Sequence, residues 1–190
     1  MIYYTQMTKP AWSILPDEWK PILTDRGLRA FRADQILQSL YRDCILDWDG
    51  ATTLPKDFRE TLKEEFPITR FEITAVSESE DGTKKLLITF ADGEAVETVL
   101  IPAKDRFTQC ISTQVGCAMG CAFCASGSCG MVRSLTADEI VAQYMAGRTF
   151  GEITNIVVMG MGEPLANYDN LLKALSVFNS PDKFAFGAPT

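Results

Sequence analysis

Apolar residues in the first 68 positions recur at helical spacing. Three helices are expected, at residues 16–25, 31–48 and 54–66. The first ends near Gly27, the second begins at Phe31 with apolar side chains three and four positions apart, and the third ends before Pro67. Residues 1–68 are therefore predicted to form a small helical accessory domain.

After residue 68, the repeat of apolar positions changes from helical spacing to every second residue. Alternation predicts three strands, at residues 71–79, 84–91 and 94–102. The tetrapeptides EDGT and ADGE between them are turn signals, so the strands are expected to form an antiparallel meander. Residues 69–103 are thus predicted to be a small β domain that links the helices to the rest of the chain.

Residues 104–190 alternate between helix and strand. A cysteine-rich loop is followed by an expected helix at 134–149, a buried apolar strand at 153–159 and a helix at 167–178. Thr136 and Glu139 have the spacing of a capping box. This order is typical of a parallel β/α fold, so the fold class is α/β, with the first units of a partial barrel. A barrel unit takes about 30 residues, so we expect residues 104–190 to be the beginning of a longer barrel.

Composition is that of an ordinary soluble domain, with 46% hydrophobic and 23% charged residues. The N-terminus does not resemble a signal peptide and no apolar run approaches about 18 residues, so a cytoplasmic protein without membrane spans is expected. The net charge of −7 disfavours broad affinity for nucleic acid. Arg26, Arg29 and Arg32 are the candidates for contact with a polyanion, although such a group is more often a solvated surface.

Residues 110–124, CISTQVGCAMGCAFC, contain four of the six cysteines, and the chain has no histidine. A disulfide is disfavoured in a reducing compartment. Zinc could use Cys117, Cys121, Cys124 and Cys129, but structural zinc sites usually pair two short knuckles across a longer spacer. Three thiols within eight residues favour a single loop around an iron–sulfur cluster, with zinc as the alternative.

A second motif, GMGEP at residues 160–164, follows the predicted apolar strand. Glycines let the backbone approach a ligand, and the carboxylate of Glu163 can accept from an ammonium group. Ligands of parallel β/α folds gather at the carboxyl ends of strands, where both motifs are expected. Met159 and Met161 either line a ligand pocket there or pack into the core.

The C-x3-C-x2-C spacing with Phe123 before the last cysteine resembles the signature of radical S-adenosylmethionine (SAM) enzymes. The segments FRADQ, DGTKK, VETVLIP, SLTADEIVAQ and ITNIVVMGMGEPLANYDN, with the cysteine segment, resemble in order the radical SAM RNA methyltransferases that modify C2 of adenine. The resemblance implies a 4Fe–4S cluster and SAM as cofactors, and 23S rRNA and tRNA as substrates. It also implies a reducing protein such as flavodoxin as partner, and a monomer.

The resemblance also assigns roles to residues. Cys117, Cys121 and Cys124 correspond to the cluster ligands, and Gly162 and Glu163 to cofactor contacts.

Two further positions correspond to catalytic residues. Cys110 matches the cysteine that resolves an RNA adduct by forming a disulfide with a methyl-carrying cysteine, and Glu97 matches the proton acceptor. The methyl-carrying cysteine of the family has no counterpart in residues 1–190, so this chain alone is expected to be inactive.

Other interpretations stay open at this stage. Cys110 could be a buried strand-end thiol and Glu97 a solvent-facing strand residue, while Cys44 is expected in the core and Cys129 in a loop. The C8-methylating resistance relatives share the same motifs. A zinc-stabilised RNA-binding module without catalysis is the alternative from another functional class.

Overall fold

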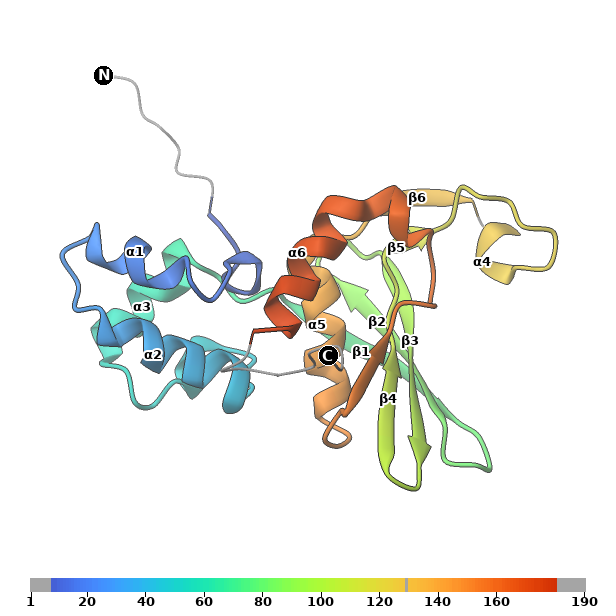
Figure 1. Cartoon of the computed structure of the whole chain (residues 1–190), viewed down its shortest axis with the longest axis horizontal. Helices are drawn as coiled ribbons and strands as arrows, with labels where there is room; N and C mark the ends of the chain where they lie inside the picture. Colours follow the sequence, from blue (N-terminus) through green and yellow to red (C-terminus); the bar gives the residue numbers. More distant parts are fainter. Residues whose placement is uncertain (1–7, 129, 181–190) are drawn as a thin grey trace, which may run out of the picture. The chain divides into compact units, whose positions relative to one another are not determined.

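The computed structural model describes residues 8–128 and 130–180 (Figure 1). The chain divides into two compact units, Met1–Thr69 and Arg70–Thr190. Each unit encloses its own apolar core, so each is described by itself.

The first unit is helical. Its elements are η1 (Ala11–Ser13), α1 (Trp19–Thr24), α2 (Phe31–Leu37), the π-helix η2 (Gln38–Arg42), η3 (Trp48–Gly50) and α3 (Lys56–Glu65). Trp12, Trp19 and Trp48 are fully buried at its centre. The Trp19 ring stands edge-on to Trp48, with centroids 6.4 Å apart, and the Trp48 Nε1–H donates to the carbonyl of Phe66 at 2.8 Å. The three predicted helices are confirmed, although their ends differ.

The helix expected over residues 31–48 ends at Arg42. Its last turn widens into the π-helix, and the chain then reverses through Cys44, whose φ is 51°. Apolar residues still occur at helical spacing after the helix ends, because Ile45 and Trp48 pack into the core from the segment after the turn. The prediction that Cys44 lies in the core was wrong, since its side chain is half-buried in the turn.

The second unit is built on a five-stranded sheet. Its strands are β1 (Phe71–Glu78), β2 (Lys84–Phe90), β3 (Ala95–Ala103), β4 (Arg106–Cys110) and β7 (Asn155–Val157), in that spatial order. The first four pair antiparallel, which confirms the predicted meander and adds β4 to it, whereas β7 runs parallel to β4. The strand expected at residues 153–159 is shorter and less buried than predicted, because β7 is at the sheet edge with β4 as its neighbour.

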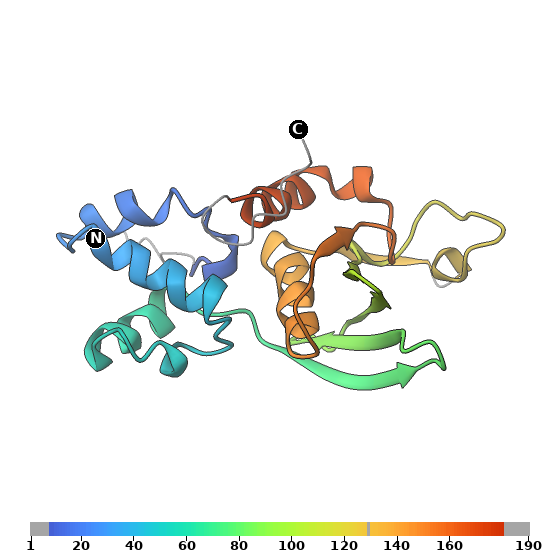
Figure 2. The ribbon, with the colours of Figure 1, turned by 60° about the horizontal axis from the view of Figure 1, so that its bottom comes forward.

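Helix α5 (Ala137–Arg148) covers one face of this sheet, and α6 (Tyr168–Phe178) packs beside α5 (Figure 2). Under α5, Leu86, Ile88, Val96 and Leu100 are buried. The predicted capping box is confirmed, with the Thr136 N–H donating to Glu139 Oε2 at 2.9 Å. The other strand positions, which face away from α5, are only partly buried.

A second, two-stranded sheet carries the cysteines. β5 (Gln114–Gly116) and β6 (Met131–Ser134) pair antiparallel, and the chain between them includes the short helix α4 (Ala125–Ser128). A 3-10 turn, η4 (Pro164–Asn167), precedes α6. Within the described ranges, no helix has the length and apolar character required to cross a bilayer.

Candidate active site

The two predicted motifs meet at the carboxyl ends of neighbouring parallel strands. Cys110 at the end of β4 is opposite Val157 at the end of β7. Backbone pairing continues beyond the strands, since the Ile111 N–H donates to the Val157 carbonyl at 2.9 Å and the Gly160 N–H donates to the Ile111 carbonyl at 3.1 Å. The α/β folds bind ligands at this end of their strands.

The cysteine loop, residues 117–130, is closed at its base by β5 and β6. Gly116 has φ 74°, and a Cβ there would lie 1.9 Å from the carbonyl oxygen of Gly130. The same carbonyl accepts from the Cys117 N–H at 2.9 Å. Only glycine therefore allows the two ends of the loop to approach this closely.

The three thiols differ in exposure. Cys117 is buried at the base of the loop, Cys121 is exposed and Cys124 is half-buried. Hydrogen bonds from the backbone N–H groups of Gly127 and Ser126 lower the pKa of Cys124. A lowered pKa favours the thiolate, which is the form that binds metals.

Cys117, Cys121 and Cys124 are the candidates for holding an iron–sulfur cluster. Among the residues that the structure describes, no group of three or more Cys, Asp or Glu side chains converges to hold one metal ion. In a cubane cluster each cysteine binds a different iron atom, so the sulfurs are separated by the cluster and need not converge on one point. Cys129, the fourth thiol of the zinc alternative, lies outside the described residues.

The glycine–glutamate turn, residues 160–163, rests directly on the segment before the cysteine loop. A Cβ at Gly160 would lie 2.6 Å from the Ser112 hydroxyl, and the Met161 carbonyl accepts from the Thr113 N–H at 2.8 Å. The carboxylate of Glu163 accepts from the Leu165 N–H at 3.0 Å and caps η4. The turn therefore packs on the segment that leads through β5 into the cysteine loop.

Cys110 and Glu97 lie on the same face of the sheet, opposite α5. Cys110 pairs with Val99, two positions from Glu97 on β3, so the two side chains are diagonal neighbours across the strands. Burial raises the pKa of the Cys110 thiol, against the effect of a hydrogen bond from the Met159 backbone N–H. Glu97 Oε1 forms an ion pair with Lys85 Nζ at 2.8 Å.

The expected disulfide is not supported by the structure. No disulfide joins any cysteines within the described part of the chain. At the end of β4, Cys110 is instead beside Val99 and Val157, its neighbours on the adjoining strands.

Comparison with known proteins identifies this arrangement. Residues 111–184, which contain both motifs, match the radical SAM superfamily. This match supports a radical SAM domain in that part of the chain. The resemblance predicted from the motifs and the α/β fold class are both confirmed.

The relatives extend the similarity over most of the chain. A dual-specificity RNA methyltransferase RlmN from Geotalea uraniireducens (strain Rf4) is 47% identical over 169 residues, which cover 89% of this chain and 49% of the relative. A probable dual-specificity RNA methyltransferase RlmN 3 from Opitutus terrae (strain DSM 11246 / JCM 15787 / PB90-1) is 46% identical over 186 residues, 87% of this chain and 50% of the relative. The chain thus spans about half the length of the curated relatives it matches.

A solved structure shows the same fold. The crystal structure of a radical SAM methyltransferase from Sphaerobacter thermophilus superposes with a TM-score of 0.87 at 38% identity, over 95% of this chain and 55% of that one. The sheet, α5 and the cysteine loop are therefore a partial radical SAM fold.

Buried polar residues around the radical SAM motifs were missed by the sequence analysis. Ser112, Gln114 and Gln143 are fully or almost fully buried. The Gln143 amide donates to the Ser112 carbonyl at 2.9 Å and accepts from the Ser112 N–H at 2.8 Å. The polar run STQ between Ile111 and Cys117 was the available signal, because polar residues at such a position are buried only with partners.

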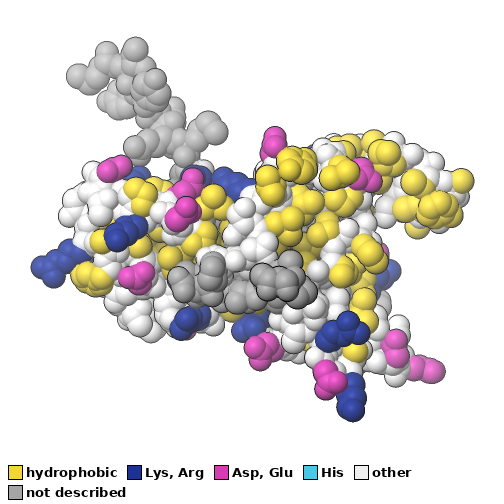
Figure 3. All heavy atoms as spheres, viewed as in Figure 1, with side chains coloured by type: hydrophobic (Ala, Val, Ile, Leu, Met, Phe, Trp, Pro, Cys, Tyr) yellow, Lys and Arg dark blue, Asp and Glu magenta, His cyan; other side chains and the backbone are white. Residues whose placement is uncertain are grey.

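Apolar side chains gather on the outer surface of this unit, over α6 and at the cysteine loop (Figure 3). Phe123 is 93% exposed and Met159 is 79% exposed. Met161, in contrast, is half-buried, and its sulfur accepts from the Glu97 N–H at 3.3 Å. Of the two methionines considered at this site, Met161 packs against the sheet and Met159 lies on the surface.

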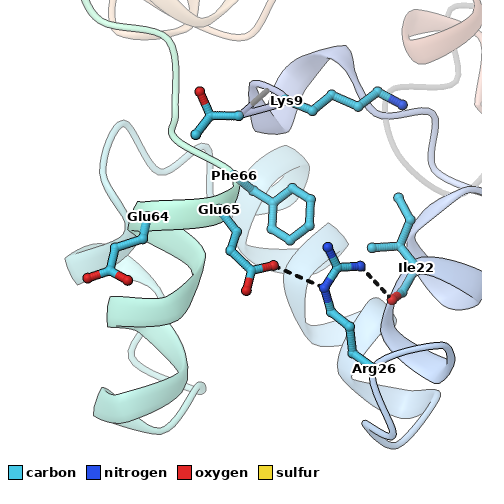
Figure 4. A pocket seen from close by; sticks show the side chains of 7 residues that line it. Lys9, Ile22, Arg26, Glu64, Glu65 and Phe66 are labelled. Carbon is cyan, nitrogen blue, oxygen red and sulfur yellow. Dashed lines mark hydrogen bonds and ion pairs between the residues drawn. The ribbon is translucent and has the colours of Figure 1, made fainter. Parts of the chain in front are cut away.

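In the helical unit, the candidate arginines make local contacts. Arg26 Nε donates to Glu65 Oε2 at 3.0 Å, and its Nη1 donates to the Ile22 carbonyl at 3.0 Å (Figure 4). These residues line a pocket of about 480 Å³. Arg32 donates to Gln35 at 2.6 Å, whereas Arg29 is exposed. Two of the three arginines are therefore engaged within their own unit.

Proposed function

We propose that this chain is part of a radical SAM methyltransferase that modifies C2 of adenine in 23S rRNA and tRNA. The observation that carries the proposal is the direct seating of the glycine–glutamate turn against the root of the cysteine loop, in a chain similar to RlmN proteins over most of its length.

Cys117, Cys121 and Cys124 are proposed to hold a 4Fe–4S cluster. When bound, the cluster and SAM would supply one-electron reductive cleavage of SAM, a chemistry that amino-acid side chains cannot provide. The N–H groups of Gly127 and Ser126 stabilise the Cys124 thiolate for this purpose. Gly162 lets the turn lie close to Gln114, at the start of β5. The Glu163 carboxylate is proposed to accept hydrogen bonds from the SAM ammonium.

Cys110 and Glu97 are proposed to act on the RNA. They share the sheet face opposite α5, at the end of β4 that carries the cysteine loop. Glu97 is proposed to take the proton from the modified adenine, with its carboxylate held by Lys85. Cys110 is proposed as the resolving thiol, and its raised pKa means that it rests as a protonated thiol.

The partners follow from the same proposal. A cytoplasmic location is proposed because these substrates are found there, and a reducing protein such as flavodoxin is proposed as the electron donor to the cluster. We propose a monomer, with the helical unit contributing to RNA contact through its arginines. Exposed Arg29 is the best placed of these for a phosphate.

Anaerobic reconstitution tests the proposal. The chain is incubated with iron, sulfide and reductant, and we expect a brown protein with about four irons per chain whose colour is bleached by dithionite. SAM should then change the electron paramagnetic resonance (EPR) signal of the reduced cluster. A colourless protein that holds stoichiometric zinc would establish the zinc-stabilised module instead.

Regiochemistry requires a second measurement. A protein that contains this sequence and its methyl-carrying cysteine is incubated with SAM, reductant and unmodified 23S rRNA or tRNA. Nucleoside mass spectrometry against both standards should find 2-methyladenosine. Finding 8-methyladenosine would assign the protein to the C8-methylating relatives.

A further inference from the structure

Gln114 is a polar side chain in an unusual place. It is the first residue of β5, three positions before Cys117, and only 1% of its surface is exposed. Burial of an amide costs free energy unless its donor and acceptor are both satisfied. The partners of this amide therefore indicate why a polar residue occupies the position.

Those partners come from two other segments. Gln114 Oε1 accepts from the backbone N–H of Glu163 at 2.9 Å. Its Nε2 donates to the Ser134 hydroxyl at 3.2 Å and lies 3.7 Å from the Met131 sulfur. One side chain thus joins β5, β6 and the glycine–glutamate turn, which are the two ends of the cysteine loop and the segment beside it.

The backbone of the turn is fitted to the same side chain. Gly162 has φ 99°, and a Cβ there would lie 2.6 Å from Gln114 Cβ. The Gln114 N–H also donates to the Met161 carbonyl at 3.3 Å. Residues 161–163 are therefore held by both the main chain and the side chain of one residue.

We propose that Gln114 is a positioning residue that fixes Glu163 relative to the cysteine loop, so that a ligand can contact both at once. The proposal rests on the proposed function. Without this amide, the Glu163 N–H loses its acceptor and the turn is no longer tied to β6. The three ligand cysteines keep their own backbone contacts, so cluster loading should survive while SAM binding weakens.

The test compares Gln114→Met with Gln109→Met. Gln109 is also fully buried, and its amide donates to Thr98 and to the Gln143 carbonyl, without contact to the turn. The two substitutions remove the same buried amide from two places in one unit. Gln114→Glu is the conservative variant, because it retains an oxygen for the Glu163 N–H.

The first readout needs no cofactor. Hydrogen exchange of the Glu163 amide in the apo chain should accelerate about tenfold in Gln114→Met, as expected for loss of one buried hydrogen bond, and should be unchanged in Gln109→Met. Gln114→Glu should restore the protection. Equal exchange in wild type and Gln114→Met would overturn the proposal.

The second readout uses the reconstituted chain. Iron per chain should be equal in all variants, and the SAM dissociation constant, from the change in the EPR signal, should rise about tenfold in Gln114→Met alone. Loss of iron in Gln114→Met would show a folding role and overturn the positioning role. If Gln114→Met does not fold, Gln114→Asn, whose shorter amide cannot reach Glu163, is judged by the same two outcomes.

These results separate the two proposals. If the wild-type chain takes up no cluster, the proposed function fails, and the role of Gln114 is decided by the exchange of the Glu163 amide. If the wild type binds the cluster and SAM but Gln114→Met binds SAM equally well, the proposed function stands and the role of Gln114 is rejected.

Discussion

At the scale of single residues, the proposed site depends on residues that are not themselves reactive as well as on the cysteines and the carboxylate. The cysteines and Glu163 were predicted from their spacing and from the resemblance. Gly116 and Gly162 are needed because the chain passes within van der Waals distance of itself at both places. Gln114 is needed because its amide pairs with both the Glu163 N–H and the Ser134 hydroxyl. Spacing identifies reactive groups, whereas close approaches and buried partners become visible only when the chain is folded.

Substitution of Gly162 by alanine should therefore destabilise the second unit. The change places a Cβ 2.6 Å from Gln114 Cβ, and it puts a residue other than glycine at a left-handed φ of 99°. We expect a loss of about 2–4 kcal/mol in urea unfolding of the unit, monitored by hydrogen exchange of β3 amides. Gly93→Ala is the control, because Gly93 has φ 86° in open space and should lose only about 1 kcal/mol. Equal losses would show that the contact with Gln114 is unimportant.

The reactivity of Cys110 should follow its raised pKa. Burial favours the protonated thiol in the folded chain, so the thiolate forms at higher pH than the ordinary value of 9.0. Iodoacetamide should label Cys110 more slowly in the native apo chain than in urea, and the native rate should still rise with pH where the unfolded rate has levelled off. Peptide mass spectrometry under anaerobic conditions measures both rates. A native rate that levels off at the same pH as the unfolded rate would contradict the assigned shift.

At the scale of elements, periodicity predicted most of the helices and strands. The strands at 71–79, 84–91 and 94–102 and the helix that begins after Thr136 were all found. The errors are at ends and edges. The second helix ends early because Cys44 takes a positive φ, and β7 is short because it pairs with β4 at the edge. The pattern of apolar residues along the chain does not show where tertiary contacts end a helix or a strand.

The N-terminus of α5 offers a test at this scale. Glu139 caps the helix and accepts two hydrogen bonds from Arg133, at 2.7 and 2.8 Å, from a largely buried position. Glu139→Ala should lower the stability of the unit by about 2–4 kcal/mol, because it removes a cap and leaves Arg133 poorly paired. Asp92→Ala is the comparison, since Asp92 contacts the same Arg133 from an exposed turn and should cost about 1 kcal/mol or less. Urea titrations of both variants measure the difference, and a larger loss for Asp92→Ala would reverse this assignment.

At the scale of the whole molecule, the chain contains two cores. All three tryptophans of the sequence, Trp12, Trp19 and Trp48, are buried in the helical unit, whereas both motifs of the proposed site lie in the other. Tryptophan fluorescence therefore reports on the first unit, and thiol labelling or bound iron reports on the second. The sequence showed a change of period near residue 70, and the structure divides into compact units at the same region.

Leu62→Ala tests whether the two cores unfold separately. Leu62 is 1% exposed in the helical unit, so its truncation should destabilise that unit by about 2–5 kcal/mol. The midpoint of the fluorescence transition in urea should fall, while the hydrogen-exchange protection of β2 amides stays the same. A matched loss of protection in β2 would mean that the chain unfolds as one cooperative system.

The sequence by itself determined the order of elements, the three clustered thiols, the glycine–glutamate motif and the resemblance that links them. These properties are local, because they depend on side-chain chemistry and on spacing along a few turns of chain. Only the tertiary structure decided that β7 pairs parallel to β4, that Cys110 and Glu97 share a sheet face, and that Gln114 joins the turn to the cysteine loop. Those relations bring together residues about 10 to 50 positions apart, and they arise from strand pairing and from the need of buried polar groups for partners.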